Sequence, residues 1–484
     1  MEGRLRTEGD CPGSGKVAFL WPGRYESTAE RTEFVEVREI RSVLGLDSDF
    51  ETNGTDRWKS RYRVSDLAVH SIGAVGCAIA DLIAARNSKQ KSQPVVVDQR
   101  LASLWFARSI EPVGWSLPPV WDAVAGDYPT KDGWIKLHTN LPHHREAACR
   151  VLGVAPERGA VAAAVSACTG NDLETAIVEA GGVAALMRSR AEWQAHAQGM
   201  AVASEPLVAW TNPRRIQPRP KQATTGVPLE GLRVLDLTRV LAGPVATRTL
   251  AGFGASVLRI DPPGWGEPNV VPDITLGKTC ATLDLRDTGP RQIFEGLLRE
   301  ADVLVHGYRP DALERLGIGK EWRRSIAPNL VEVCLDAYGW SGPWAGRRGF
   351  DSLVQMSSGI ADSGMMWARA IKPTPLPVQA LDHATGYLMA AAVLRVLVAC
   401  ERQEPVSDAK LSLARTAELL ASHQQEDAEA MDLTFAENDW ADSLEQTPWG
   451  AARRLKAPLQ VGELEMTWRS PACELGSAKP QWAA

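Results

Sequence analysis

Residues 233–263 read RVLDLTRVLAGPVATRTLAGFGASVLRIDPP and decide how the second half of this 484-residue chain is interpreted. The apolar run from Val234 to Leu237 predicts a buried strand, and a helix-length segment ending near Gly252–Gly254 follows it. A second apolar run, from Ser256 to Ile260, completes a βαβ unit whose two strands are expected to be parallel. The turn Thr238–Pro244 then lies at the carboxyl end of the first strand, where open α/β sheets bind ligands.

Composition excludes several classes of function. With 53 basic and 59 acidic residues, the charge balance is not typical of proteins that bind nucleic acid or anionic membranes. No apolar run approaches the roughly 20 residues that span a bilayer. The N-terminus lacks the apolar core of a secretory signal, so we expect a cytoplasmic protein with no nucleic-acid or membrane partner. The eight cysteines are scattered without a CxxC pair, so neither a disulfide framework nor a metal site is expected.

A proline-rich stretch, residues 211–228, separates two halves of the chain. It carries basic residues and no apolar periodicity, so we expect an extended linker. After it, strands are expected near 233–237, 255–261, 301–308 and 330–336. The predicted organisation is an N-terminal segment (1–60), a helical region with a smaller α+β domain (61–210), the linker (211–228), a ligand-binding α/β domain (229–400), and a return helix with a C-terminal tail (401–484).

An internal repeat links the two halves. Residues 67–83 align with 380–396, pairing His70 with His383 and Gly73 with Gly386 at an offset of 313. Residues 96–102 then align with 406–412 at an offset of 310. Each copy reads as a long Ala- and Leu-rich helix, a charged turn, and a short strand leading to another helix. Chance similarity between two alanine-rich helices is the alternative explanation.

The sequence of residues 233–263 resembles the start of the family III CoA-transferase sequences, a group that includes acyl-CoA racemases. The resemblance is strong over 229–395 and moderate over 60–210. It implies an α/β fold, with a parallel, open-sheet, Rossmann-like CoA-binding domain, a smaller α+β domain and long connecting helices. Because residues 133–208 resemble the later part of the family and 229–422 its front, we expect a tandem or permuted arrangement that assembles one fold from both halves.

The resemblance implies that Asp382 is the catalytic nucleophile. Asp382 precedes Thr385-Gly386 at the start of a predicted long helix, and a carboxylate there can attack a thioester to form an acyl anhydride. A helix N-cap is the alternative role. The equivalent position in the first repeat is Val69, which cannot do this chemistry, so one active site per chain is expected.

A second acidic candidate is Asp351, either an active-site residue or a cap at a strand end. It follows Gly349-Phe350. At the position of Phe350 the racemases carry a histidine that shuttles a proton. Phe350 therefore disfavours racemisation, unless another histidine takes that role. The histidines considered as substitutes are His383, His306 and His70.

Recognition of CoA, bound as a substrate rather than as a permanent cofactor, is implied for seven residues. Arg259 and Lys278 match basic positions of the family that would bond phosphates. Tyr308 and Arg309 match an aromatic-Arg-Pro motif that lies against the nucleotide, although Gly307 replaces the family's asparagine. Leu241, Gly243 and Pro244 form the turn that would face the thioester, with Leu241 in place of a glutamine found in some transferases. Solvated loop charge is the alternative for the basic residues.

Three functions remain open: a CoA-transferase acting on acyl-CoA and carboxylic acids, an acyl-CoA racemase or isomerase, and a catalytically silent CoA-binding partner. An intertwined homodimer and a pseudo-dimeric single chain are both compatible with the repeat. His143-His144-Arg145 is interpreted as surface or capping residues, because adjacent helix positions diverge. A roomy apolar acyl site and core packing are alternative explanations for five large residues: Trp340, Met356, Met365, Met366 and Trp367.

Overall fold

The computed structural model describes residues 35–87, 93–217, 227–424 and 433–482. Its main element is a seven-stranded sheet in the order β10-β9-β8-β11-β12-β13-β7. All neighbouring strands are parallel except β13 and β7, which pair antiparallel. The strands are β7 (Ala209–Arg214), β8 (Arg233–Leu237), β9 (Ser256–Asp261), β10 (Lys278–Thr282), β11 (Val303–His306), β12 (Val331–Asp336) and β13 (Val406–Ser412). The α/β class and the parallel βαβ unit expected from residues 233–263 are confirmed.

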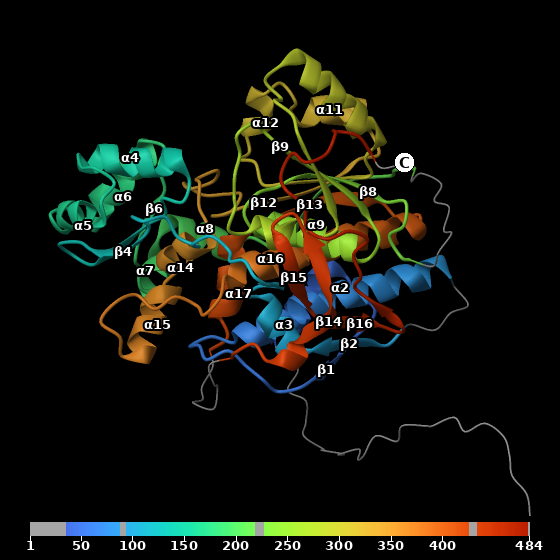
Figure 1. The fold of residues 1–484 in the computed structure, drawn as a ribbon, viewed down its shortest axis with the longest axis horizontal. Coiled ribbons are helices and arrows are strands. Elements are labelled where there is room, and N and C mark those ends of the chain that lie inside the picture. Colours follow the sequence, from blue (N-terminus) through green and yellow to red (C-terminus); the bar gives the residue numbers. More distant parts are fainter. Residues whose placement is uncertain (1–34, 88–92, 218–226, 425–432, 483–484) are drawn as a thin grey trace, which may run out of the picture. The chain divides into compact units, whose positions relative to one another are not determined.

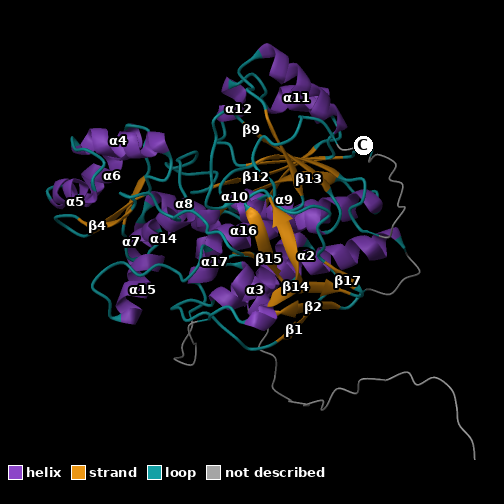
Figure 2. Ribbon diagram, in the orientation of Figure 1, coloured by secondary structure: helices purple, strands orange, loops and turns teal. Residues whose placement is uncertain are grey.

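Alternate side chains of these strands enter two different cores. On β8, Val234 packs with one cluster and Leu235 with the other; on β9, Val257 and Leu258 divide in the same way. This alternation follows from the two-residue period of a strand. Helices cover both faces (Figures 1 and 2). Helices α11 (Thr288–Glu300) and α12 (Ala312–Arg315) lie on one face, and α9 (Ala242–Gly252) and α16 (Ala380–Glu401) lie on the other.

Two long apolar helices form the centre of the molecule. Helix α2 (Val64–Arg86) has 23 residues and α16 has 22, and they pack against one another. By length and composition each could cross a membrane, so the expectation that no segment approaches that length is wrong. Most of each helix is buried inside the protein, as in the core helices of soluble domains.

The repeat predicted from sequence is present as structure. Helix α2 leads to β2 (Val95–Asp98) and α3 (Gln99–Trp105), and α16 leads to β13 and α17 (Leu413–Ala421). Each repeat strand has a parallel neighbour on one side, β1 (Glu51–Asn53) for β2 and β12 for β13. On its other side, each has an antiparallel neighbour from the opposite half of the chain. This shared pattern of helix, strand and neighbours argues against chance similarity.

The antiparallel neighbours are exchanged between the halves. Strand β7, which ends the first half, pairs with β13 of the second half, with Ala409 opposite Trp210. Strand β16 (Leu459–Val461), near the C-terminus, pairs with β2 of the first half, with Val97 opposite Leu459. The predicted linker is therefore partly wrong: residues 211–214 belong to β7, while 218–226 lie outside the described residues.

The smaller α+β region is built from the first half. Strands β4 (Gly126–Pro129), β5 (Trp134–Leu137) and β6 (Ala184–Leu186) form an antiparallel sheet. Helices α4 (Pro142–Leu152), α5 (Arg158–Ser166) and α6 (Gly170–Glu179) pack on it around their own core. A third sheet joins β3 (Ile110–Pro112) to the C-terminal hairpin of β14 (Trp440–Thr447) and β15 (Gly450–Leu455). The other helices are α1 (Val35–Leu44), α7 (Arg190–Ala195), α8 (Ala197–Ser204), α10 (Val271–Ile274), α13 (Lys320–Ile326), α14 (Asp351–Ser357) and α15 (Ile360–Ala368), with η1 (Glu437–Asp439) and β17 (Leu464–Glu465) completing the described elements.

The packing of α16 against α9 generates a stability prediction. A Cβ at Gly386 would lie 2.4 Å from the carbonyl oxygen of Ala242, so Gly386→Ala must push the two helices apart. We expect a loss of about 1–3 kcal/mol in the free energy of unfolding, measured by denaturant titration. The matched control is Gly296→Ala in α11, where a Cβ meets no atom within 4 Å and should be neutral or stabilising. Equal stability of the two variants would contradict the packing.

Candidate active site

A cavity of about 400 Å³ opens at the carboxyl ends of the parallel strands. Residues at or just beyond the ends of β8, β11 and β12 line it, together with the first residues of α16 and α17. The first half of the chain contributes Leu141, His143 and His144 from the start of α4. One chain thus supplies both sides of the cavity. A wider hollow of about 840 Å³ lies along β2 and the β14–β15 hairpin, and Asp382 is not among its lining residues.

Asp382 lies in the first turn of α16 and lines the cavity, where the sequence placed it. Its side chain is 7% exposed and accepts no hydrogen bond from any residue that the structure describes. Burial, and then repulsion from Asp351, raise the pKa of its carboxyl well above the ordinary value. A desolvated carboxyl with open lone pairs that faces a cavity is a candidate nucleophile.

Asp351 begins α14 rather than ending a strand, and it does not line the cavity. Its carboxylate accepts hydrogen bonds from the backbone N–H groups of Leu381 (2.9 Å) and Asp382 (3.1 Å), and from the side chain of Gln355. Burial raises its pKa to about 6. Asp351 therefore fixes the first turn of α16, and the three donors make it the carboxyl of the pair that ionises first.

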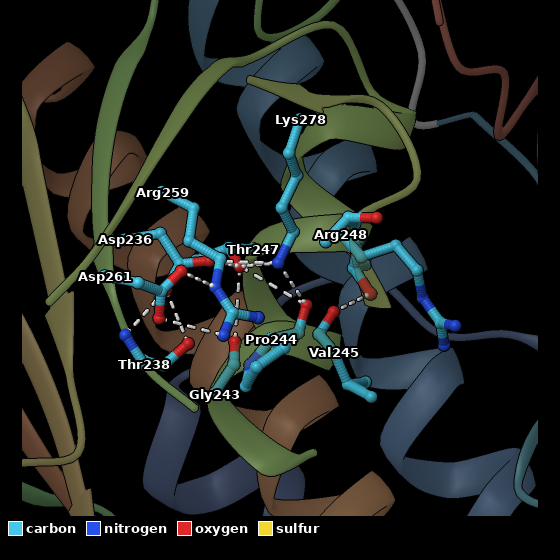
Figure 3. Close-up of polar contacts among 12 residues, drawn as sticks. Asp236, Thr238, Gly243, Pro244, Val245, Thr247, Arg248, Arg259, Asp261 and Lys278 are labelled. Atoms are coloured by element: carbon cyan, nitrogen blue, oxygen red, sulfur yellow. Dashed lines mark hydrogen bonds and ion pairs between the residues drawn. The ribbon is translucent and has the colours of Figure 1, made fainter. Parts of the chain in front are cut away.

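The charged ends of Arg259 and Lys278 meet polar groups of the protein (Figure 3). Both residues are buried, and neither is among the residues that line the cavity. Lys278 is fully buried, with its ammonium 2.9 Å from Asp236 and 3.0 Å from the carbonyl oxygen of Pro244. Burial lowers the pKa of Lys278. Arg259 forms ion pairs with Asp261 at 2.8 Å and Glu267 at 3.0 Å. Both positive charges thus meet protein carboxylates rather than the cavity.

The turn after β8 is held in a strained conformation. Val240 has φ +64°, a conformation that costs a β-branched residue about 1–3 kcal/mol. Its N–H donates to Glu267 at 2.7 Å, and Glu267 also accepts from the indole of Trp265. The turn thereby presents Leu241 to the cavity.

The glycine of the turn shapes the cavity without lining it. A Cβ at Gly243 would lie 2.3 Å from the Thr238 side chain, so only glycine fits. Gly243 and Pro244 are not among the cavity-lining residues. Of the three turn residues predicted to contact CoA, Leu241 alone faces the cavity.

One wall of the cavity is cationic and aromatic. Tyr308 and Arg309, which the sequence analysis assigned to CoA recognition, are among its residues. The guanidinium of Arg239, from the turn itself, lies 4.4 Å from the ring centre of Trp265 and 5.0 Å from that of Tyr308, to whose hydroxyl it donates at 2.7 Å. Sequence analysis missed Arg239 and Trp265, although both lie within or just beyond the diagnostic stretch 233–263. Arg347 and Arg348 also line this cavity.

The histidines are arranged differently from the expectation. None of the three proposed substitutes for the racemase histidine, His70, His306 and His383, lines the cavity. His144 does, and with only 2% exposure it is not a surface residue, so that prediction was wrong. Its burial results from packing against Phe350, a contact that adjacent sequence cannot reveal.

The five large residues considered for an apolar acyl site do not form one. None of them lines the cavity. Met356 is buried in a core cluster, whereas Met366 and Trp367 are exposed. Among the described residues, no three His, Cys, Asp or Glu side chains converge in a metal-binding arrangement.

A parallel sheet with a cavity at its carboxyl edge, a cationic aromatic wall and a desolvated carboxylate define an α/β protein with a candidate ligand-binding site. Residues 229–439 match the family model described as CoA-transferase family III.

Several curated proteins are similar to part of the chain. A probable fatty acyl-CoA transferase of Mycobacterium tuberculosis is 37% identical over 190 residues, covering 36% of this chain and 48% of that protein. The succinyl-CoA:glutarate CoA-transferase of Mus musculus is 34% identical over 185 residues, covering 35% and 42%. A crystal structure of the mycobacterial protein shows 33% identity and a TM-score of 0.37, covering 44% of this chain and 57% of that one. The chain spans about half, or less, of the length of the curated relatives it matches.

The core position of Lys278 generates a second prediction. Lys278→Met leaves Asp236 buried without its cation, and we expect a loss of about 3–5 kcal/mol in the free energy of unfolding. Arg286→Met is the matched control, because its pair with Asp284 is on the surface. Thermal and denaturant unfolding measure the effect. A Lys278→Met variant of normal stability with weakened CoA binding would instead make Lys278 a phosphate ligand.

Proposed function

We propose that the protein is an acyl-CoA:carboxylate CoA-transferase whose nucleophile is Asp382. The observation that carries the proposal is the Asp382 carboxyl, which faces the cavity from the first turn of α16 without a hydrogen-bond donor among the described residues. The family of residues 229–439 and the named activities of its relatives support the same chemistry.

The reaction needs only this carboxylate and the two substrates. The Asp382 carboxylate attacks the thioester carbonyl and the C–S bond breaks. CoA leaves as a thiolate, and the acyl group stays on Asp382 as a mixed anhydride. The thiolate then attacks the aspartyl carbonyl, which releases the first acid as a carboxylate and leaves an aspartyl-CoA thioester. The acceptor carboxylate reverses both steps, so new acyl-CoA forms and Asp382 is regenerated. No net proton is consumed.

The cationic aromatic wall is the proposed site of the nucleotide part of CoA. Arg309 and Arg348 offer guanidinium groups for phosphates, and Tyr308 and Trp265 offer rings for the adenine. Arg239, already held between those two rings, positions them. Arg259 and Lys278 have no part in this contact.

One site per chain is part of the proposal. Val69 occupies the position of Asp382 in the first repeat and is buried in the core. The first half instead supplies one wall of the cavity that holds Asp382. This arrangement favours a pseudo-dimeric chain with a single complete site. The racemase alternative loses the three substitute histidines considered for it, because none of them lines the cavity.

Removing the nucleophile tests the proposal directly. Asp382→Ala should lower the exchange of labelled acid into acyl-CoA by at least about a thousandfold, while CoA binding measured by calorimetry stays largely unchanged. In the wild type, acyl-CoA followed by hydroxylamine should modify Asp382, as detected by peptide mass spectrometry. Transfer that persists in Asp382→Ala would remove the nucleophile assignment, and CoA binding without any exchange in the wild type would indicate a silent binder.

The Asp351–Asp382 pair predicts a pH effect. Attack requires ionised Asp382, so activity should fall as the pH drops through its raised pKa. Asp351→Asn removes one cause of that raised pKa while its oxygen still accepts the backbone N–H bonds. The acidic limb of the exchange rate should therefore move to lower pH. Asp362→Asn in α15, outside the cavity, is the control, and an unshifted limb in Asp351→Asn would contradict the coupling.

A further inference from the structure

One polar side chain of the cavity has no hydrogen-bond partner within the described part of the chain and no role in the transfer steps. His144, in the first turn of α4, lines the same cavity as Asp382 and is 2% exposed. Neither of its ring nitrogens forms a hydrogen bond with any residue that the structure describes. Two hydrogen-bonding atoms thus remain unsatisfied in a buried wall.

The neighbours of His144 hold the ring without bonding its nitrogens. The ring of Phe350 packs edge-on at 5.9 Å between ring centres, and that of His143 lies at 4.1 Å. Phe350 is itself stacked on His138 at 4.0 Å with nearly parallel rings, so this side of the cavity is tightly packed.

The charge state of His144 follows from the same surroundings. Burial, followed by repulsion from His143 and Arg348, lowers its pKa to about 3. At neutral pH the ring is therefore uncharged, with one nitrogen that donates and one that accepts. It is suited to hydrogen bonding and poorly suited to removing protons.

A substrate that fills the cavity decides whether these nitrogens are satisfied. Leaving a buried polar group unpaired is unfavourable, because its hydrogen bonds to water are lost and not replaced. An alkyl chain would displace water from the imidazole without forming a hydrogen bond in its place. A group that can hydrogen-bond would restore the bond, and sites built in this way reject analogues that lack the group.

We propose that His144 is a specificity residue that hydrogen-bonds the acyl portion of the substrate held against Asp382. It selects acids that carry a second hydrogen-bonding group, such as a hydroxyl, an oxo group or a second carboxylate, over unsubstituted alkyl acids of equal length. The inference rests on the proposed transfer function. Through His144, helix α4 of the first half takes part directly in selecting the substrate that reacts with Asp382 of the second half.

The experiment measures self-exchange, the entry of each labelled acid into its own CoA thioester, so that neither physiological substrate needs to be known. The probes are butyrate with butyryl-CoA, 3-hydroxybutyrate with 3-hydroxybutyryl-CoA, and succinate with succinyl-CoA. In the wild type, at least one polar acid should exchange about ten- to a hundredfold faster than butyrate. The two polar probes distinguish a hydroxyl from a carboxylate as the preferred partner.

His144→Leu should bring the polar-to-alkyl ratio close to one, mainly by slowing the polar acid. His144→Asn keeps a hydrogen-bonding side chain and should retain part of the preference, which a merely structural role of His144 would not explain. His423→Leu, a histidine at the end of α17 outside the cavity, is the control, and thermal unfolding verifies that all variants are folded.

Three results would overturn the proposal. A wild-type ratio near one, or an unchanged ratio in His144→Leu, would remove the specificity role while Asp382-dependent exchange leaves the transfer function standing. Deuterium entering the α-carbon of the acyl group in a His144-dependent manner would make His144 a base instead. Absence of exchange with every acid would remove the transfer function and this inference with it.

Discussion

The ion pair between Lys278 and Asp236 is the interaction on which the site depends. It joins β10 to β8 beneath the first turns of α9, where Lys278 also bonds Thr247 at 2.6 Å. Its neighbour, Arg259, links Asp261 to Glu267, and Glu267 holds the strained backbone of Val240. Buried charges are stable only when they are paired. These buried ion pairs therefore fix the position and direction of the turn after β8, which lines the cavity beside Asp382.

Parts of this architecture could be predicted from local patterns. Residues 233–263 determine a βαβ unit by themselves, because apolar runs of strand length flank a helix-length segment. The helix–strand–helix repeat could be recognised because His70, Gly73 and Asp98 recur in order as His383, Gly386 and Asp408. The placement of Asp382 at a helix start likewise needs only nearby sequence.

Other parts depend on residues that meet only in the folded chain. A lysine on a strand has the same appearance in sequence whether its counter-ion is a ligand phosphate or a protein carboxylate, and Asp236 lies 42 positions from Lys278. His144 is buried by Phe350, which comes from the other half of the chain. The first residues of the expected linker form a strand only because β13 offers them an open edge. Sequence periodicity carries no information about such partners.

The exchange of β7 and β16 also has a consequence for synthesis on the ribosome. Strand β2 is translated early, but the strand that pairs with its open edge, β16, is made more than 350 residues later, as the pairing of Val97 with Leu459 shows. An unpaired strand edge is a template for wrong pairing, and contacts between distant residues form slowly. The edge of β2 therefore stays unpaired until β16 has emerged, which makes this a chain that would benefit from a chaperone during its production.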